Sequence, residues 1–245
     1  MKIALASIPV KNRNISFNIQ NMLDAIQACT GLADIILFGE SVLQGFDCLS
    51  WDYKADCSVA VTLADLPIRL LCEAAKKSRI AVSFGFIERE KECLYSSQVF
   101  IDADGRIMNV FHRVSIGWKD CSRTDTHYCE GTNFHSFSYG GKNFAIGLCG
   151  DLWTDGRPAE MKALNVNVIL WPVWCDYDAD DWNQDIKYEY AAQAGLCGRD
   201  VCLVNPFCAD VGAECRSVGG SVHFHEGRIV SEHPAGTAGI LIVDI

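Results

Sequence analysis

Short apolar runs that recur along the whole chain limit what this sequence can fold into more than any other feature. Each run is a few residues long and rich in β-branched and aromatic side chains, a composition typical of strands. The runs cover residues 3–8, 35–38, 80–86, 97–101, 144–148, 166–171, 201–204, 220–224 and 239–243. Several are apolar at every position, which predicts strands that are buried on both faces of a sheet.

Helical periods separate some of these runs. The predicted helices cover residues 19–29, 67–78 and 183–194. Asn14 or Ser16 could cap the first helix, and Pro67 suits the first turn of the second. Helices and strands alternate in the first half of the chain and hairpin-like strands follow, so the pattern predicts a mixed α/β layered fold. Because we find no repeat or linker, we expect residues 1–245 to form a single domain.

The charge balance is acidic. Lys and Arg number 21 against 31 Asp and Glu, and the formal net charge of −10 would repel a phosphate backbone or an anionic membrane surface. The 13 cysteines are odd in number and lack close pairs, which favours reduced thiols over a disulfide framework or a structural zinc site. The first apolar run is broken at Pro9, and no stretch approaches the ~18 apolar residues of a membrane span. We therefore expect a cytoplasmic protein that binds neither nucleic acid nor membranes.

Two polar residues stand where core strands end. Cys149 follows the run 144–148 at a glycine-containing turn, whose amides and following helix would lower the pKa of the thiol and supply donors for an oxyanion. Glu40 follows the run 35–38 and could act as a general base. The alternatives are a small buried hydrophobe for Cys149 and a loop carboxylate for Glu40.

Five segments occur in an order and spacing that is more specific than any one of them. They are the opening strand at residues 2–10, Phe-Gly-Glu at 38–40 with Gln-Gly-Phe at 44–46, the hairpin at 94–106, Leu-Cys-Gly-Asp at 148–151, and Val-Asn-Pro at 204–206 with Gly-Gly-Ser at 219–221. In this combination the chain resembles the carbon-nitrogen hydrolase, or nitrilase, superfamily over nearly its whole length.

The resemblance implies a fold, an assembly and a chemistry. The fold would be an α-β-β-α sandwich of two mixed sheets flanked by helices, assembled as a homodimer or higher homo-oligomer. A Glu-Lys-Cys triad would cleave a non-peptide carbon–nitrogen bond of a small-molecule amide or nitrile, without a metal or organic cofactor. Glu40 would take the proton of Cys149, the thiolate would form a thioester, and a lysine would stabilise the oxyanion.

The sequence departs from the family pattern at the lysine. Arg113 occupies that position, and its guanidinium could hold an oxyanion or a carboxylate but stays protonated. Lys119, six residues further on, could reach into the pocket instead. A solvated surface cation is the alternative for each.

The residues around this triad are also candidates for the site. The family's second glutamate has no clean match: Thr124 or Asp125 lies near its place, and Glu130 occupies the place of a proline. Asp125 and Glu130 could orient the triad or an amine, although either could be an ordinary loop carboxylate. Gly150 stands where an aromatic residue is common, which would widen the pocket or bring its backbone closer to substrate. Trp174 could form an aromatic wall, with packing as the alternative role.

One further pattern is a possible metal site. His223 and His225 share one face of a strand, but the segment matches a closing hairpin and is expected to be exposed, so we predict no metal site.

Three functions use these residues. A hydrolase is favoured, with an amide preferred to a nitrile because Gly-Asp follows Cys149 in the manner of amidase branches. A small-molecule-binding or regulatory protein on the same fold is the rival, because the lysine is absent. An acyl-transferring relative would use the same residues.

Overall fold

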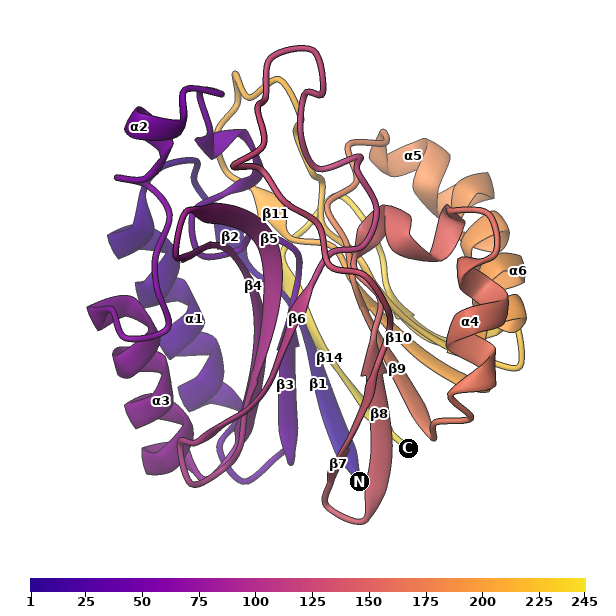
Figure 1. The fold of residues 1–245 in the computed structure, drawn as a ribbon. Helices are drawn as coiled ribbons and strands as arrows, with labels where there is room; N and C mark the ends of the chain where they lie inside the picture. The colour runs from indigo at the N-terminus through magenta and orange to yellow at the C-terminus, as the bar shows by residue number, and fades with distance from the viewer.

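Two six-stranded sheets lie face to face in the computed structural model, which describes residues 1–245 (Figure 1). The first sheet contains, in spatial order, β14 (Gly239–Asp244), β1 (Lys2–Ser7), β3 (Ile35–Phe38), β4 (Ala81–Glu90), β5 (Cys93–Ile101) and β6 (Ile107–His112). The second contains β13 (Arg228–His233), β12 (Ser221–His225), β10 (Asp200–Val204), β9 (Val168–Pro172), β8 (Lys142–Ile146) and β7 (Ser136–Tyr139). A small third sheet pairs β2 (Pro9–Val10) with β11 (Phe207–Cys208). Both large sheets are mixed, with three central parallel strands each.

Helices cover the outer face of each large sheet (Figure 1). On one side lie α1 (Ile15–Cys29) and α3 (Leu66–Ser78), and on the other α4 (Arg157–Ala163), α5 (Ala179–Asp181) and α6 (Lys187–Cys197). The remaining helix, α2 (Tyr53–Asp56), is a single turn at the end of the sandwich. The α-β-β-α sandwich predicted from the sequence is confirmed.

The central strands are apolar throughout because both of their faces are buried. On β1, Ile3 and Leu5 belong to the cluster that includes Trp171 of the second sheet, whereas Ala4 and Ala6 belong to the cluster beneath α1 and α3. Alternate residues of a strand point to opposite faces, so one strand supplies both layers of the core.

Local signals set the helix ends. The Asn14 side chain accepts a hydrogen bond from the Phe17 N–H at 3.1 Å and caps α1, and Pro67 lies in the first turn of α3. The third predicted helix corresponds to a π-helical turn at Trp182–Ile186 that continues into α6. The sequence did not predict β7, β13 or α4.

The expectations about membrane spans and disulfides concern the whole chain. No helix has the length and apolar character needed to cross a membrane. All 13 cysteines carry free thiols in the structure, with no disulfide between them.

Candidate active site

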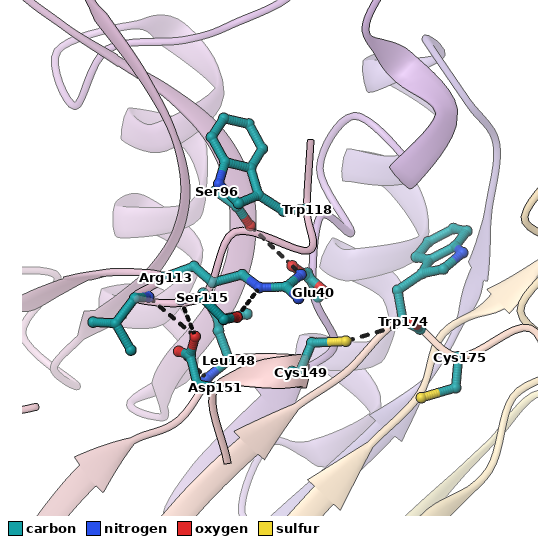
Figure 2. Close-up of polar contacts among 12 residues, drawn as sticks. Glu40, Ser96, Arg113, Ser115, Trp118, Leu148, Cys149, Asp151, Trp174 and Cys175 are labelled. Carbon is teal, nitrogen blue, oxygen red and sulfur yellow. Dashed lines mark hydrogen bonds and ion pairs between the residues drawn. The ribbon is translucent and has the colours of Figure 1, made fainter. Parts of the chain in front are cut away.

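Three strands from the two sheets bring polar side chains to one end of the sandwich. Glu40 follows β3, Arg113 follows β6 and Cys149 follows β8. The Glu40 N–H donates to the carbonyl oxygen of Val173 at 3.2 Å, which ties the end of β3 to the end of β9 across the two sheets. Figure 2 shows the three side chains converging. The structure therefore brings together the three residues for which the sequence predicted catalytic roles.

The Glu40 side chain is fully buried, and only one of its oxygens has a partner. Oε1 accepts hydrogen bonds from Ser96 Oγ at 3.0 Å and from Arg113 Nη1 at 2.8 Å (Figure 2). Oε2 has none. Buried polar atoms are rarely left unpaired, because a lost hydrogen bond costs about 1–3 kcal/mol. An oxygen kept free in this way can accept a proton from another group in the site.

Arg113 is buried and held in one orientation, so it is not a solvated surface cation. Its Nε donates to Ser115 Oγ at 2.9 Å and its Nη1 donates to Glu40, whereas Nη2 donates to no protein group. Burial is the largest single influence and disfavours the charge, but Glu40, Cys149 and Asp151 together outweigh it and raise the pKa of Arg113 above its usual range. The side chain is thus a fixed positive charge whose Nη2 amino group is free, suited to stabilise an oxyanion and unable to exchange a proton.

The Arg113 guanidinium also occupies the space that a side chain at position 150 would need. A Cβ atom added to Gly150 would lie 2.8 Å from Arg113 Nη2 and 3.4 Å from Ser115 Oγ. A lysine would end in a single ammonium instead of a planar fork. Glycine at position 150 and arginine at position 113 therefore complement each other in size.

This complementarity predicts strong coupling between the two positions. Gly150→Ala should lower kcat/KM about 100-fold, because the methyl group displaces the free donor of Arg113. Arg113→Lys alone should also lower kcat/KM. When Gly150→Ala is added to Arg113→Lys, kcat/KM should fall by less than about a further tenfold. The difference between the two backgrounds is the coupling, which for neighbouring residues is about 0.5–3 kcal/mol. Gly212→Ala is the matched control, because nothing lies near a Cβ there. Equal effects of Gly150→Ala in the two backgrounds would show that the residues act independently.

Cys149 lies at the start of a 3₁₀ turn, Cys149–Trp153, with its backbone in the left-handed region at φ 48°. Its sulfur lies 3.7 Å from the carbonyl oxygen of Trp174. The neighbouring Cys175 thiol, burial and the charge of Glu40 raise the pKa of Cys149 well above its usual value, and Arg113 opposes this only in part. The lowered pKa expected from the turn was wrong, because those three influences outweigh the one charge that opposes them. The resting thiol is protonated and needs a base.

Asp151 connects the nucleophile turn to the segment that carries Arg113. Its Oδ1 accepts the N–H groups of Val114 at 3.0 Å and Ser115 at 2.8 Å, and its Oδ2 accepts the N–H of Leu148 at 2.9 Å (Figure 2). Burial raises the pKa of Asp151 to about 6, although Arg113 lowers it in part. The sequence analysis did not identify this positioning role, because its three partners are backbone groups.

The raised pKa of Asp151 predicts a pH dependence. Below a pH of about 6 the carboxyl is protonated and holds the three N–H groups less strongly, so kcat/KM should rise with pH through this value. Asp151→Asn should lower kcat/KM about tenfold above this pH and remove the step, because an amide does not titrate. A profile from pH 5 to 8 for both proteins tests this, and an unchanged step near pH 6 in the variant contradicts it.

A cavity of about 290 Å³ opens beside Cys149. It is lined by Cys149, Gly150, Trp153, Trp174, Cys175, Asp176, Tyr177, Glu189 and Tyr190. Among the predicted substrate-binding residues, Gly150 and Trp174 are in this lining. The Trp174 ring stacks on Phe46 with ring centres 5.7 Å apart, which fixes this wall.

The other predicted substrate-binding residues do not line this cavity. Lys119 Nζ forms an ion pair with Glu130 Oε1 at 2.6 Å and donates to the carbonyl oxygen of Tyr128. Asp125 has a largely exposed side chain that pairs with His127 at 2.9 Å. Lys119 and Glu130 thus pair with each other and do not line the cavity as expected. Asp125 lies at the surface. The sequence did not show this because each of the three finds its partner within its own loop.

Metal-ligand side chains gather elsewhere. The one compact group of three is Asp200 of β10 with His223 and His225 of β12. The expectation that both histidines are exposed was wrong for His223, which is 5% exposed.

Known proteins are similar to this chain across the segments that form the site. Residues 2–245 match the family model for carbon-nitrogen hydrolases. An (R)-stereoselective amidase of Pseudomonas sp is 25% identical over 170 residues, which cover 69% of this chain and 59% of the amidase, so the chain spans less than two thirds of that relative. A citrullinase of Francisella tularensis is 27% identical over 204 residues, covering 77% of this chain and 71% of the citrullinase. The structure of a mutant of the Nesterenkonia AN1 amidase from the nitrilase superfamily superposes with a TM-score of 0.78 at 18% identity, covering 100% of this chain and 90% of that one.

Proposed function

The chain belongs to the carbon-nitrogen hydrolase family, and from that premise we propose that it hydrolyses a small-molecule amide through a thioester on Cys149. One observation carries the proposal: Glu40 is buried beside Cys149 with Oε2 left without a partner. A binding protein gains nothing from an unpaired buried oxygen, whereas a general base requires one. The relatives include an amidase and a citrullinase but also two nitrilases, so the preference for an amide over a nitrile rests on the Gly-Asp that follows Cys149.

The first half-reaction forms the thioester. Glu40 Oε2 takes the proton of the Cys149 thiol, and the sulfur attacks the carbonyl carbon of the amide. Negative charge develops on the carbonyl oxygen, where Arg113 Nη2 and the Gly150 N–H, which makes no hydrogen bond outside its own turn, can donate to it. The carbon–nitrogen bond then breaks, and the protonated Glu40 returns its proton to the leaving ammonia or amine.

The second half-reaction releases the acid. Glu40, ionised again, takes a proton from a water molecule, whose oxygen attacks the thioester carbon. The carbon–sulfur bond breaks, and Cys149 recovers its proton. Arg113 stays charged in every step, so Glu40 carries all proton transfer while Arg113 supplies electrostatic stabilisation alone.

Ammonia release from a panel of compounds tests this function. The panel holds small amides, ω-amides, N-carbamoyl compounds and nitriles, each incubated with the purified protein. We expect turnover within the first three classes and little with nitriles. If no class is turned over and none leaves an adduct on the protein, the rival function as a small-molecule-binding protein is favoured. Transfer to added hydroxylamine in excess of hydrolysis would instead favour an acyltransferase.

The cavity lining favours a substrate with a positive charge. Aromatic rings of Trp153, Tyr177 and Tyr190 line it together with the carboxylates of Asp176 and Glu189. Neither carboxylate has an ion-pair partner, and the lining contains no Lys, Arg or His. Aromatic faces and unpaired carboxylates both attract ammonium and guanidinium groups.

A matched pair of amides measures this preference. An amide with a terminal ammonium should have a lower KM than its uncharged isostere, at similar kcat. Asp176→Asn and Glu189→Gln should each raise KM for the ammonium compound about threefold, as exposed charge pairs do. The uncharged amide is the internal control. Equal KM changes for both amides would indicate a loss of shape instead of charge.

A cytoplasmic location, a homodimeric or higher assembly, and the organisation as a single domain stay predictions from the sequence.

A further inference from the structure

A second group of reactive side chains lies at the other end of the second sheet from Cys149. Asp200 is the first residue of β10, and the active site adjoins the last residues of the parallel strands β8 and β9. Asp200 pairs in register with His225 of the antiparallel strand β12, and His223 is two residues before it. Because side chains alternate along a strand, the three point to the same face of the sheet.

Hydrogen bonds hold these side chains close together. Asp200 Oδ1 lies 2.9 Å from His223 Nε2 and 2.8 Å from His225 Nδ1. The three potential ligand atoms all lie within 4.8 Å of one another. His223 is 5% exposed, and the group adjoins a cavity of about 640 Å³ that is also lined by Lys142 and Arg199.

Two imidazoles and one carboxylate form a donor set for a borderline metal ion. In a tetrahedral zinc site with bonds of about 2.0–2.1 Å, neighbouring ligand atoms lie about 3.4 Å apart. The two short contacts of Asp200 would have to open by about half an ångström, which side-chain rotation alone can supply. Three protein ligands leave one coordination position open, and the adjacent cavity provides room for it.

We propose that Asp200, His223 and His225 bind a divalent transition-metal ion, with zinc as the best fit and the fourth position open to water or a small anion. The ring nitrogens that bind the metal must be unprotonated, so each neutral imidazole would carry its single proton on its other nitrogen. Lys142 at the rim could attract an anion as the fourth ligand, although Asp244 lines the same cavity and Arg199 pairs with Glu226 at 3.6 Å. The ion would join β10 to β12 far from the thiol chemistry, and the site is independent of the proposed function.

Zinc titration tests the site by comparing the number of zinc ions bound by the wild type and by matched variants. The free thiols also bind zinc, so the wild type is compared with His223→Ala/His225→Ala, which retains every cysteine. The double variant should bind one equivalent less, and His233→Ala on β13 should bind as the wild type does. Equal stoichiometry of the double variant and the wild type overturns the proposal.

A second measurement begins with the wild-type protein, whose folding is not in question. In protein with ¹⁵N-labelled histidine, one equivalent of zinc should shift the ring resonances of two histidines and leave the other four unchanged. Asp200→Asn should weaken this binding at least tenfold. Ring resonances that do not move while zinc binds would assign the ion to the thiols and reject the site.

Discussion

Cys149→Ala is expected to reduce kcat by more than about 10⁴-fold, because it removes the sulfur that forms the proposed thioester. The charges of Glu40 and Arg113 both act on the ionisation of this sulfur. Removing it leaves the cavity and its binding groups intact. Substrate should therefore still bind to the variant, which a thermal shift with excess amide can measure.

The neighbouring thiol provides the matched control for this variant. Cys175 lines the same cavity, and its sulfur lies 3.1 Å from the Tyr190 hydroxyl. Cys175→Ala removes the same atom from the same cavity and should keep kcat within about tenfold of the wild type. Similar losses of kcat in the two variants would mean that removing any thiol from the cavity impairs it. Turnover that survives Cys149→Ala would exclude Cys149 as the nucleophile.

Glu40→Gln should reduce kcat by about 10³-fold or more, the range expected when a general acid–base group is lost. A glutamine oxygen can still accept from Ser96 Oγ and Arg113 Nη1, so the geometry around Oε1 is retained. The amide nitrogen that replaces Oε2 cannot accept a proton. Because the charge of Glu40 raises the pKa of Cys149, the variant should lower that pKa, so iodoacetamide should alkylate the thiol faster at neutral pH although turnover falls.

Ser96→Ala separates proton transfer from positioning at this carboxylate. It removes one hydrogen bond to Oε1 but leaves Oε2 able to take a proton, so kcat should fall by less than about tenfold. If Glu40→Gln and Ser96→Ala lower kcat equally, Glu40 acts only as a partner of Arg113. Slower alkylation of Cys149 in Glu40→Gln than in the wild type would contradict the effect of the Glu40 charge on the thiol.

Much of the fold could be predicted from the sequence because its central strands are buried on both faces. Runs such as residues 35–38 are apolar throughout, which predicts a strand buried on both faces. The strands β7 and β13 were missed because they are edge strands with half of their residues exposed, so their apolar pattern is weak. The local sequence pattern was sufficient to predict strands whose residues are all buried. It was insufficient for strands whose residues are only partly buried.

The candidate site was likewise predictable in part, where a residue's place in a strand was enough to identify it. Glu40 and Cys149 were predictable because each ends a core strand, and strand ends in such sheets meet at one edge. The bonds of Asp151 and the effect of Cys175 on the thiol were not, since both depend on contacts between distant segments. Gly150 was noted as a departure from the family pattern, but its physical reason, the bulk of Arg113, required coordinates.

The most direct test of the central claim is the intact mass of the protein during turnover. The wild type is mixed with an amide substrate, quenched in acid within the first turnovers and weighed by mass spectrometry. We predict a fraction of the protein heavier by the mass of the acyl group, located on the Cys149 peptide and absent from Cys149→Ala. Turnover without any added mass, or an acyl group on another residue, would contradict the thioester mechanism.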